Sequence, residues 1–359
     1  MLVDPARSYD LIGDVHGCAN TLARLLEVMG YRKQGGVWRH PERRVIFLGD
    51  IIDRGPRIRE ALHLVWDMVE AGQAHCIIGN HEFNALGWYM PAPPESGKAF
   101  VREHSPRFAM LLQETFDQFE AYPDEWKAFR DWFYELPLYL ENDRFRVVHA
   151  CWDSAVIDRL RPRLENGCLD PAFVREAGID GGFACKALDR LLRGTDMPLP
   201  DGLTMTSEEG FVRTFFRTKF WEANPSTYGD VVFQPGGLPE QAARVPLSQR
   251  QKSRLFLYGP DEPLLFVGHY WRRGTPGPIR DNLACLDYSA VKYDKLVAYR
   301  LDQETRLDPA KFVWVDVQRE EAHLGSWRGV APADIGRSER VPGPVAAPAG
   351  ALPGLRRGG

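Results

Sequence analysis

The sequence predicts an α/β fold built around a sheet whose strands alternate with helices. Three short apolar runs, at residues 9–12, 45–48 and 76–78, each stop at a Gly-Asp or Gly-Asn pair. Buried strands that open into loops have this pattern. The segments between the runs carry apolar residues at helical spacing, so the N-terminal part of the chain predicts the order β-α-β-α-β.

Two helices are expected between these three strands. The first is indicated by Leu22, Leu25, Leu26 and Met29. The second is indicated by Ile58, Ala61, Leu62, Val65 and Val69. Residues at this spacing share one face of a helix, which can cover the sheet. In sheets of this kind ligands collect at the carboxyl ends of the strands, where the Gly-Asp and Gly-Asn pairs fall.

The middle of the chain interrupts this pattern twice. Residues 83–143 are rich in aromatic residues with a proline-rich break near their start, and we expect an inserted helical region there. A strand is predicted at residues 145–148. Residues 153–263 have weak periodicity and several Gly and Pro breaks, which predicts a cap over the sheet. The strand pattern resumes at residues 264–267, 283–286 and 295–301.

We therefore expect one domain over residues 1–329 and a disordered tail over residues 330–359. In the tail Pro, Ala and Gly dominate, with few large apolar residues to offset the entropy of ordering.

Composition narrows the class of protein. Hydrophobic residues make up 44% of the chain and charged residues 26%, as in ordinary globular proteins. No apolar run is long enough to span a bilayer, and the first strand leaves no space for a signal peptide, so we expect a cytoplasmic protein. The scattered cysteines predict reduced thiols. A formal net charge of -4 gives no overall attraction to nucleic acid, and no stable binding to it is expected.

Side chains that can bind metals follow the predicted strands. They are Asp14, His16, Asp50, Asn80, His149 and His269. This mixed set of nitrogen and oxygen ligands, with no thiolate, suits Mn, Fe, Zn or Mg ions better than a structural zinc site. Six such groups can hold two ions if one carboxylate bridges them. Two ions about 3.5–4 Å apart can stabilise the attacking and leaving oxygens of a phosphoryl displacement.

Five motifs in order carry a family resemblance. They are Gly13-Asp14-Val15-His16-Gly17, Gly49-Asp50-Ile51-Ile52-Asp53-Arg54-Gly55, Gly79-Asn80-His81-Glu82, His149 and Gly268-His269. The set resembles the calcineurin-like metallophosphoesterases, and more narrowly the branch that holds phosphoprotein phosphatases and symmetrical diadenosine tetraphosphate hydrolases. The resemblance implies a sandwich of two mixed β-sheets flanked by helices. It covers about half of the chain and leaves out the inserted helical region and the cap.

The resemblance also implies a metal centre and a reaction. Asp14 and His16 would bind the first metal ion, Asp50 would bridge, and the second ion would be bound by Asn80, His149 and His269. The cofactors would be two divalent metal ions, with manganese expected first and iron, zinc, nickel and magnesium as alternatives. A hydroxide between the ions would attack a phosphate ester or anhydride in line.

Roles for three further residues follow from the same resemblance. His81 matches the general acid, Asp53 matches its orienting partner, and Arg54 matches the phosphate clamp. Two more arginines are candidates for substrate binding from the residues alone. Arg217 in the cap can project onto a polyphosphate chain or belong to a solvated face, and Arg272 belongs to a basic pair after Gly268-His269.

Departures from the family pattern bear on the substrate. The second histidine of Gly-His-x-His is replaced in Gly268-His269-Tyr270-Trp271, as in the narrower branch. The Ser-Ala-Pro-Asn-Tyr signature of eukaryotic protein phosphatases is missing from the sequence, and Leu286-Asp287-Tyr288-Ser289 only partly matches the Leu-Asp-Thr-Gly of dinucleotide hydrolases. We expect a dinucleoside polyphosphate or another small phosphorylated metabolite as substrate. The alternatives are a serine/threonine phosphoprotein phosphatase and a catalytically silent binding module, which the intact ligand set disfavours.

Overall fold

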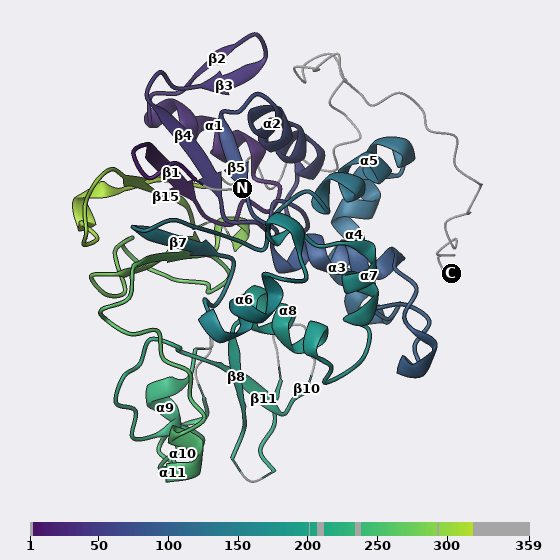
Figure 1. Ribbon diagram of the computed structural model, residues 1–359, viewed down its shortest axis with the longest axis vertical. Coiled ribbons are helices and arrows are strands. Elements are labelled where there is room, and N and C mark those ends of the chain that lie inside the picture. The colour runs from purple at the N-terminus through teal and green to yellow at the C-terminus, as the bar shows by residue number, and fades with distance from the viewer. Residues whose placement is uncertain (1–2, 201, 207–211, 234–237, 293, 319–359) are drawn as a thin grey trace.

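The computed structural model describes residues 3–200, 202–206, 212–233, 238–292 and 294–318. The tail predicted at residues 330–359 lies outside the described residues. Two β-sheets pack against each other, and helices cover their outer sides (Figure 1). Among the described residues no helix combines the length and the apolar character needed to cross a bilayer.

The larger sheet contains the N-terminal strands. Its order is β14 (Asp287–Tyr288), β15 (Lys295–Leu301), β1 (Ser8–Ile12), β4 (Arg43–Phe47) and β5 (Ala74–Cys76), with β16 (Phe312–Asp316) also paired to β15. The strands β1, β4 and β5 run parallel, whereas β15 is antiparallel to β1. Helices α1 (Ala19–Val28) and α2 (Ile58–Glu70) connect the parallel strands, which confirms the predicted order β-α-β-α-β. A hairpin of β2 (Arg32–Gln34) and β3 (Val37–Arg39) precedes β4.

The smaller sheet has the order β13 (Leu283–Cys285), β12 (Leu264–Val267), β7 (Phe145–Val148) and β6 (Tyr139–Glu141). Strand β12 is parallel to both β7 and β13, whereas β6 is antiparallel to β7. Both sheets are therefore mixed, as the resemblance implied. The bounds of β7, β12 and β15 equal the predicted ranges, whereas β6 and β16 were not predicted.

Each central strand is buried on both faces. In β1 and β4, Leu11 and Ile46 belong to a hydrophobic cluster between the sheets, together with Phe145 and Phe266. Their neighbour Ile12 belongs to the other large cluster, which includes the apolar faces of α1 and α2. Successive side chains of a strand point to opposite faces, so burial on both faces explains why these strands read as unbroken apolar runs.

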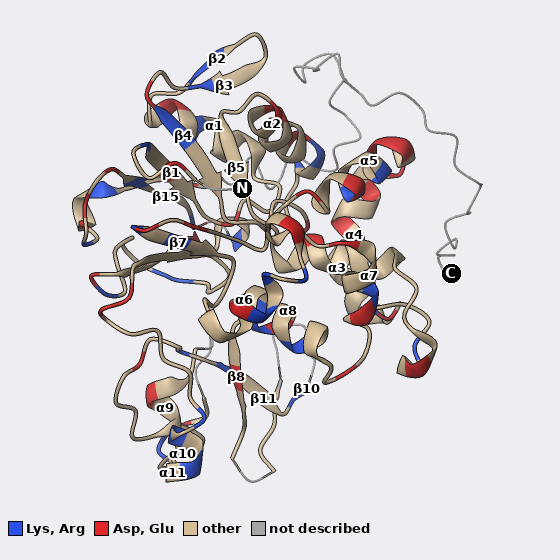
Figure 2. Cartoon of the chain, in the orientation of Figure 1, with Lys and Arg blue, Asp and Glu red and all other residues tan. Residues whose placement is uncertain are grey.

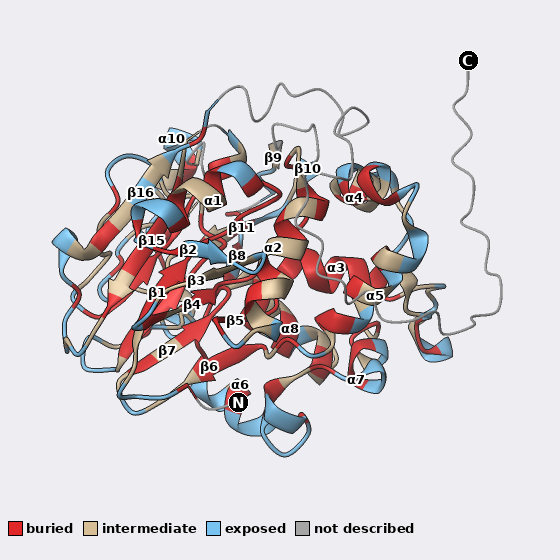
Figure 3. Ribbon diagram, turned by 90° about the horizontal axis from the view of Figure 1, so that it is seen from above, coloured by how far each residue is buried: buried red, intermediate tan, exposed pale blue. Residues whose placement is uncertain are grey.

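The inserted region contains helices that pack on the sandwich. They are α3 (Asn80–Tyr89), α4 (Pro106–Phe119) and α5 (Pro123–Phe133). Helix α3 is buried along nearly its whole length, as Figure 3 shows. Helix α5 contributes aromatic side chains to the main hydrophobic cluster, namely Trp126, Phe129, Trp132 and Phe133. Because they are buried, they form part of the core and offer no exposed surface on which a nucleotide base could stack.

The cap begins with three helices and continues into short strands. The helices are α6 (Ser154–Leu160), α7 (Pro171–Glu176) and α8 (Phe183–Arg193). The strands are β8 (Thr195–Pro198), β9 (Met205–Thr206), β10 (Val212–Arg213) and β11 (Phe215–Thr218). Three short helices follow, α9 (Tyr228–Val231), α10 (Glu240–Ala243) and α11 (Gln249–Lys252). A small cluster of its own, including Met197, Phe216, Tyr228 and Val231, packs this part of the cap.

The described residues also include four short 3-10 helices. They are η1 (Pro94–Ser96), η2 (Glu165–Gly167), η3 (Ala290–Lys292) and η4 (Pro309–Lys311).

Candidate metal centre

The six predicted metal ligands all follow strands. Asp14 and His16 follow β1, Asp50 follows β4 and Asn80 begins α3 after β5. In the smaller sheet His149 follows β7 and His269 follows β12. None of the six residues is more than 8% exposed. The edges of the two sheets therefore bring together ligands that lie far apart in the sequence.

The backbone at this edge is strained. Five predicted site residues have positive φ angles, namely His16 (43°), Asp50 (52°), Asp53 (68°), Arg54 (67°) and His269 (62°). Non-glycine residues rarely adopt this conformation, and it persists only where the surrounding structure enforces it. Such a concentration of strained residues is typical of functional sites.

Glu82 supplies part of that enforcement. Its buried carboxylate accepts hydrogen bonds from the backbone N–H groups of Asp50 (2.9 Å), Ile51 (2.8 Å), Ile52 (3.3 Å) and Gly79 (2.9 Å). Gly79 is required for the close approach, because a Cβ atom there would lie 2.2 Å from Oδ1 of Asp50. Through these bonds Glu82 connects the start of α3 to the loop after β4 and holds that loop in place.

The Asp50 carboxylate lies among the histidine side chains of the candidate site. Its Oδ2 atom lies 3.6 Å from Nε2 of His16, 3.8 Å from Nε2 of His81 and 3.4 Å from Nε2 of His149. Two groups of possible metal ligands share it, one with His16 and His81 and the other with His149 and His269. Burial opposes ionisation of Asp50, but these imidazoles together hold its pKa well below the usual range.

The histidines present their Nε2 atoms to this carboxylate. Nδ1 of His16 hydrogen-bonds the carbonyl of Ile52 at 2.8 Å, and Nδ1 of His149 hydrogen-bonds the carbonyl of Leu48 at 2.7 Å. Such bonds place a proton on Nδ1 and orient Nε2 toward the site, where Nε2 of His149 also lies 3.1 Å from Oδ1 of Asn80. Nε2 of His269 is buried and has no hydrogen-bond partner among the described residues. Burial and the charge of Arg217 lower the pKa of His269, which favours the neutral form that binds metals.

Several carboxylates are buried close together around Asp50. Asp14 accepts the backbone N–H of His269 at 3.1 and 3.2 Å, and a Cβ atom on Gly268 would lie 2.1 Å from its Oδ1. Burial and the charges of Asp287 and Asp50 raise the pKa of Asp14. Oδ2 of Asp287 is also buried without a hydrogen-bond partner among the described residues. An orphaned imidazole nitrogen beside crowded carboxylates fits divalent cations.

Asp287 was not among the predicted site residues. Burial raises its pKa to about 6, and its Oδ1 accepts the backbone N–H of Ser289 at 2.9 Å. The signal that points to it is its position directly after the predicted strand at residues 283–286, as in the other ligand motifs; in the structure it is the first residue of β14.

His81 and Asp53 form a buried pair. Nδ1 of His81 lies 2.6 Å from Oδ2 of Asp53, and the backbone N–H of His81 donates to Oδ1 of Asp50 at 3.0 Å. Burial lowers the pKa of His81 to about 3 and raises that of Asp53. Burial therefore disfavours the charged form of both side chains, and an anion beside Nε2 would favour protonated His81.

Thr115 of α4 holds the other side of Asp53. Its hydroxyl donates to Oδ1 of Asp53 and accepts the Asp53 backbone N–H at 3.1 Å. Gln118, one turn later, accepts the N–H of Ile58 at 2.6 Å and donates to the carbonyl of Gly55 at 3.0 Å. Neither residue was predicted as part of the site, because no local pattern in the sequence connects α4 with a loop about sixty residues earlier.

Of the three predicted substrate-binding arginines, two approach the cluster. Nη1 of Arg54 lies 3.4 Å from Nε2 of His16, and its Cζ lies 4.7 Å from the centre of the Trp271 ring. Nη1 of Arg217 donates to the carbonyl of His269 at 3.4 Å. Arg272 instead lies over the ring of Tyr288, with Cζ 5.8 Å from its centre.

Comparisons with known proteins indicate a family for this chain. A family model described as calcineurin-like phosphoesterase matches residues 9–176. A protein of Halalkalibacterium halodurans named bis(5'-nucleosyl)-tetraphosphatase PrpE [asymmetrical] is 31% identical over 181 residues, which cover 48% of this chain and 69% of that protein. A protein of the same name from Bacillus cereus is 28% identical over 213 residues, which cover 57% of this chain and 81% of that protein.

Solved structures were also found to be similar. A protein serine/threonine phosphatase from Saccharomyces cerevisiae matches with a TM-score of 0.42 and 15% identity, covering 88% of this chain and 80% of that chain. A cold-active protein-tyrosine phosphatase of a Shewanella species matches with a TM-score of 0.41 and 16% identity, covering 89% of this chain and 83% of that chain.

Proposed function

Because the chain belongs to the calcineurin-like phosphoesterase family, we propose that it is a dinuclear metal-dependent hydrolase of small phosphorylated compounds, with dinucleoside polyphosphates as the first candidate. The observation that carries the proposal is the shared position of Asp50, whose carboxylate belongs to two separate groups of possible ligands. A carboxylate in this position is suited to bridging two ions.

Six residues would hold the ions in this proposal. Asp14 and His16 would bind one ion, Asp50 would bridge, and the second ion would be bound by Asn80, His149 and His269. When bound, two divalent ions supply charge stabilisation for phosphoryl transfer and lower the pKa of water. The ligand chemistry favours manganese as the first ion to test, with iron, zinc, nickel and magnesium as alternatives.

The chain's own residues would then position the substrate and move a proton. Arg54 and Arg217 would hold phosphate oxygens, since a guanidinium can donate two parallel hydrogen bonds. As water attacks phosphorus and the bond to the leaving oxygen breaks, Nε2 of protonated His81 would donate its proton to that oxygen. Asp53 would keep the imidazole in the required orientation through Nδ1.

The names of the relatives support nucleoside polyphosphates as substrates. Those proteins are named asymmetrical tetraphosphatases, whereas the motifs resembled the symmetrical hydrolases. Cleavage of a dinucleoside tetraphosphate distinguishes the two modes, because asymmetrical cleavage yields a mononucleotide and a triphosphate, and symmetrical cleavage yields two diphosphates.

A substrate panel tests the proposal. Purified protein with added Mn²⁺ is assayed on diadenosine tetraphosphate, a phosphoserine peptide and p-nitrophenyl phosphate, with product nucleotides separated by chromatography. We expect metal-dependent hydrolysis of the generic ester and the highest kcat/KM for the dinucleotide. A preference for the phosphopeptide would instead establish a protein phosphatase. Failure to hydrolyse any of the three with any of the five candidate metals would support the silent binding module.

A further inference from the structure

We propose that Arg193, supported by Arg102, forms a second anion subsite beside the metal centre for a phosphate linked to the one being hydrolysed. This inference rests on the proposed function and narrows its substrate to compounds with two or more consecutive phosphates. The subsite lies where the cap meets α3, outside the motifs that carry the family resemblance.

The C-terminal end of α8 is held against both histidine-bearing loops of the smaller sheet. The carbonyl of Leu191 accepts the backbone N–H of Ala150, next to His149, at 2.8 Å. On the other side, a Cβ atom on Gly194 would lie 2.0 Å from the hydroxyl of Tyr270, which follows His269. Arg193 lies between these two contacts, directly before Gly194, so its backbone is fixed at the edge of the centre.

The Arg193 side chain extends from there to α3. Its Nη2 donates to Oδ1 of Asn84 at 2.8 Å, and Asn84 is buried. Asn84 lies four residues after Asn80 and three after His81, and residues at these spacings share one face of a helix. The guanidinium is therefore anchored one helical turn from a predicted metal ligand and from the predicted acid.

Positive charge is in excess at this anchor. Nε of Arg102 donates to the same Oδ1 of Asn84 at 3.0 Å, so two guanidinium groups share one neutral oxygen. Burial and the charge of Arg193 lower the pKa of Arg102 to about 9. Arg193 also lies 3.4 Å from Asp189, but that carboxylate is 47% exposed and interacts weakly through solvent. A bound anion would offset the repulsion between the two arginines.

The other two cations of the site occupy different positions. Arg217 belongs to β11, which pairs with β8 directly after Gly194, and it contacts the His269 carbonyl. Arg54 lies on the opposite side, against His16 and Trp271. Figure 2 shows further Lys and Arg residues along α8. Arg54 and Arg217 suffice to hold one phosphate, so Arg193 is suited to a neighbouring phosphate of the same substrate.

The test compares a one-phosphate and a three-phosphate ligand. In the full chain with free Mn²⁺ held constant, inorganic tripolyphosphate is titrated as an inhibitor of p-nitrophenyl phosphate hydrolysis. We expect Arg193→Gln to raise the Ki of tripolyphosphate about tenfold relative to the KM of p-nitrophenyl phosphate. Arg193→Lys should raise the Ki of tripolyphosphate by less than Arg193→Gln does, since lysine keeps the charge but lacks the planar guanidinium group.

Arg190→Gln provides the matched control. It removes the same charge one turn earlier on α8, where Arg190 pairs with Asp153 at 3.5 Å. It should leave both constants within about twofold, and thermal melts exclude unfolding of each variant. An unchanged ratio in Arg193→Gln, or an equal loss in the control, overturns the subsite.

Calorimetric titration separates the subsite from the proposed function. If the wild-type protein hydrolyses no ester, the function fails, but tripolyphosphate binding can still be compared between wild type and Arg193→Gln. Weaker tripolyphosphate binding by Arg193→Gln would then support the subsite even though the proposed hydrolase function had failed. Equal binding in both proteins would reject it.

Discussion

At the scale of single residues, Thr115 positions Asp53. Its hydroxyl donates to one Asp53 oxygen while His81 contacts the other, and both Thr115 and Asp53 are fully buried. We expect Thr115→Ala to lower kcat about tenfold for a phosphate ester with a poor leaving group, with little change in KM. Thr115→Ser, which keeps the hydroxyl, should restore most of kcat. Equal losses in the two variants would show that Thr115 acts only through packing.

His81 itself should act on the leaving group. We expect His81→Asn to lower turnover of a poor leaving group by about two to four orders of magnitude and of p-nitrophenyl phosphate by less. Asp53→Asn should also lower the turnover of both substrates. Turnover by the double variant should be little lower than that of His81→Asn alone. Steady-state kinetics on both substrates checks this. Losses that multiply in the double variant would mean that the two residues act independently.

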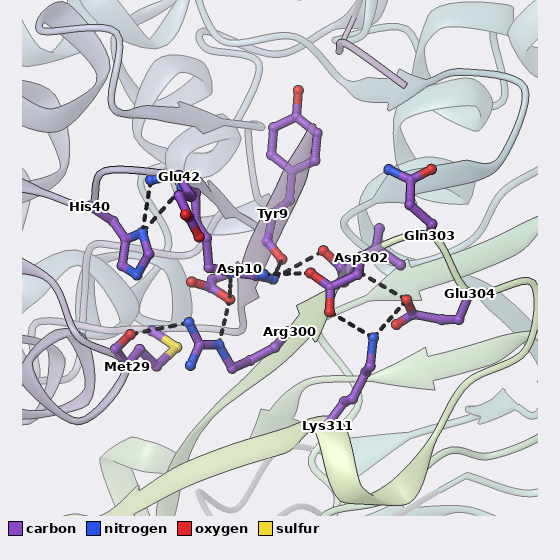
Figure 4. A network of polar contacts seen from close by, with 12 residues as sticks. Tyr9, Asp10, Met29, His40, Glu42, Arg300, Asp302, Gln303, Glu304 and Lys311 are labelled. Atoms are coloured by element: carbon purple, nitrogen blue, oxygen red, sulfur yellow. Dashed lines mark hydrogen bonds and ion pairs between the residues drawn. The ribbon is translucent and has the colours of Figure 1, made fainter. Parts of the chain in front are cut away.

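At the scale of elements, a buried ion network joins β1, β4 and β15 (Figure 4). Asp10 is fully buried and accepts hydrogen bonds from Nε of Arg43 at 2.9 Å, Nε of Arg300 at 3.1 Å and the hydroxyl of Tyr31 at 3.0 Å. At the end of β15, Lys311 donates to Asp302 and Glu304, each at 2.8 Å. The first group is enclosed, whereas Asp302 is 43% exposed.

This difference predicts unequal costs of neutralising the two aspartates. We expect Asp10→Asn to lower the free energy of unfolding by about 3–5 kcal/mol, because the buried Arg43 would lose its enclosed partner charge and keep only its ion pair with Asp302, which is 43% exposed. Asp302→Asn should cost about 1 kcal/mol or less, as exposed pairs do. Urea unfolding of the two variants beside the wild type measures both values. Similar costs would show that water reaches Asp10 as easily as Asp302.

At the scale of the whole molecule, the candidate metal centre links the two sheets. Its proposed ligands follow β1, β4, β5, β7 and β12, and the carboxylates of Asp14, Asp50 and Asp287 are buried near one another. Bound cations would relieve that repulsion and stabilise the folded state. At an ion concentration of about 100 times Kd, one site adds about 2.7 kcal/mol.

We therefore expect Mn²⁺ to raise the Tm of the metal-free protein and a chelator to reverse the rise. Asp50→Asn should bind fewer ions and show a smaller rise, because a neutral amide cannot bridge two dications as a carboxylate does. The distant variant Asp302→Asn should respond to Mn²⁺ as the wild type does. Melting curves with measured metal content test this, and a full response in Asp50→Asn would refute its bridging role.

Local patterns in the sequence were sufficient for the central strands and for the candidate ligands. β12 has the predicted bounds because a strand buried on both faces leaves an unbroken apolar run, and in β7 and β15 the apolar residues outweigh the half-buried Arg146 and Arg300. The ligands could be named because each follows such a run within a short motif. The edge strand β16 escaped prediction because its exposure alternates and Trp314 is 38% exposed, so its apolar residues carry no clear signal of burial.

Contacts between distant segments were decided only by the tertiary structure. Thr115 reaches Asp53 from an inserted helix, Arg193 reaches Asn84 from the cap, and Arg217 reaches the carbonyl of His269. Nothing in the residues around these positions encodes such pairings, because they depend on how helices and cap pack on the sandwich. The fold class and the chemistry expected at the strand ends could be predicted without a structure, since both follow from local periodicity and residue type. Packing determined which side chains surround that chemistry, because it alone brings segments from different parts of the chain to within hydrogen-bond distance.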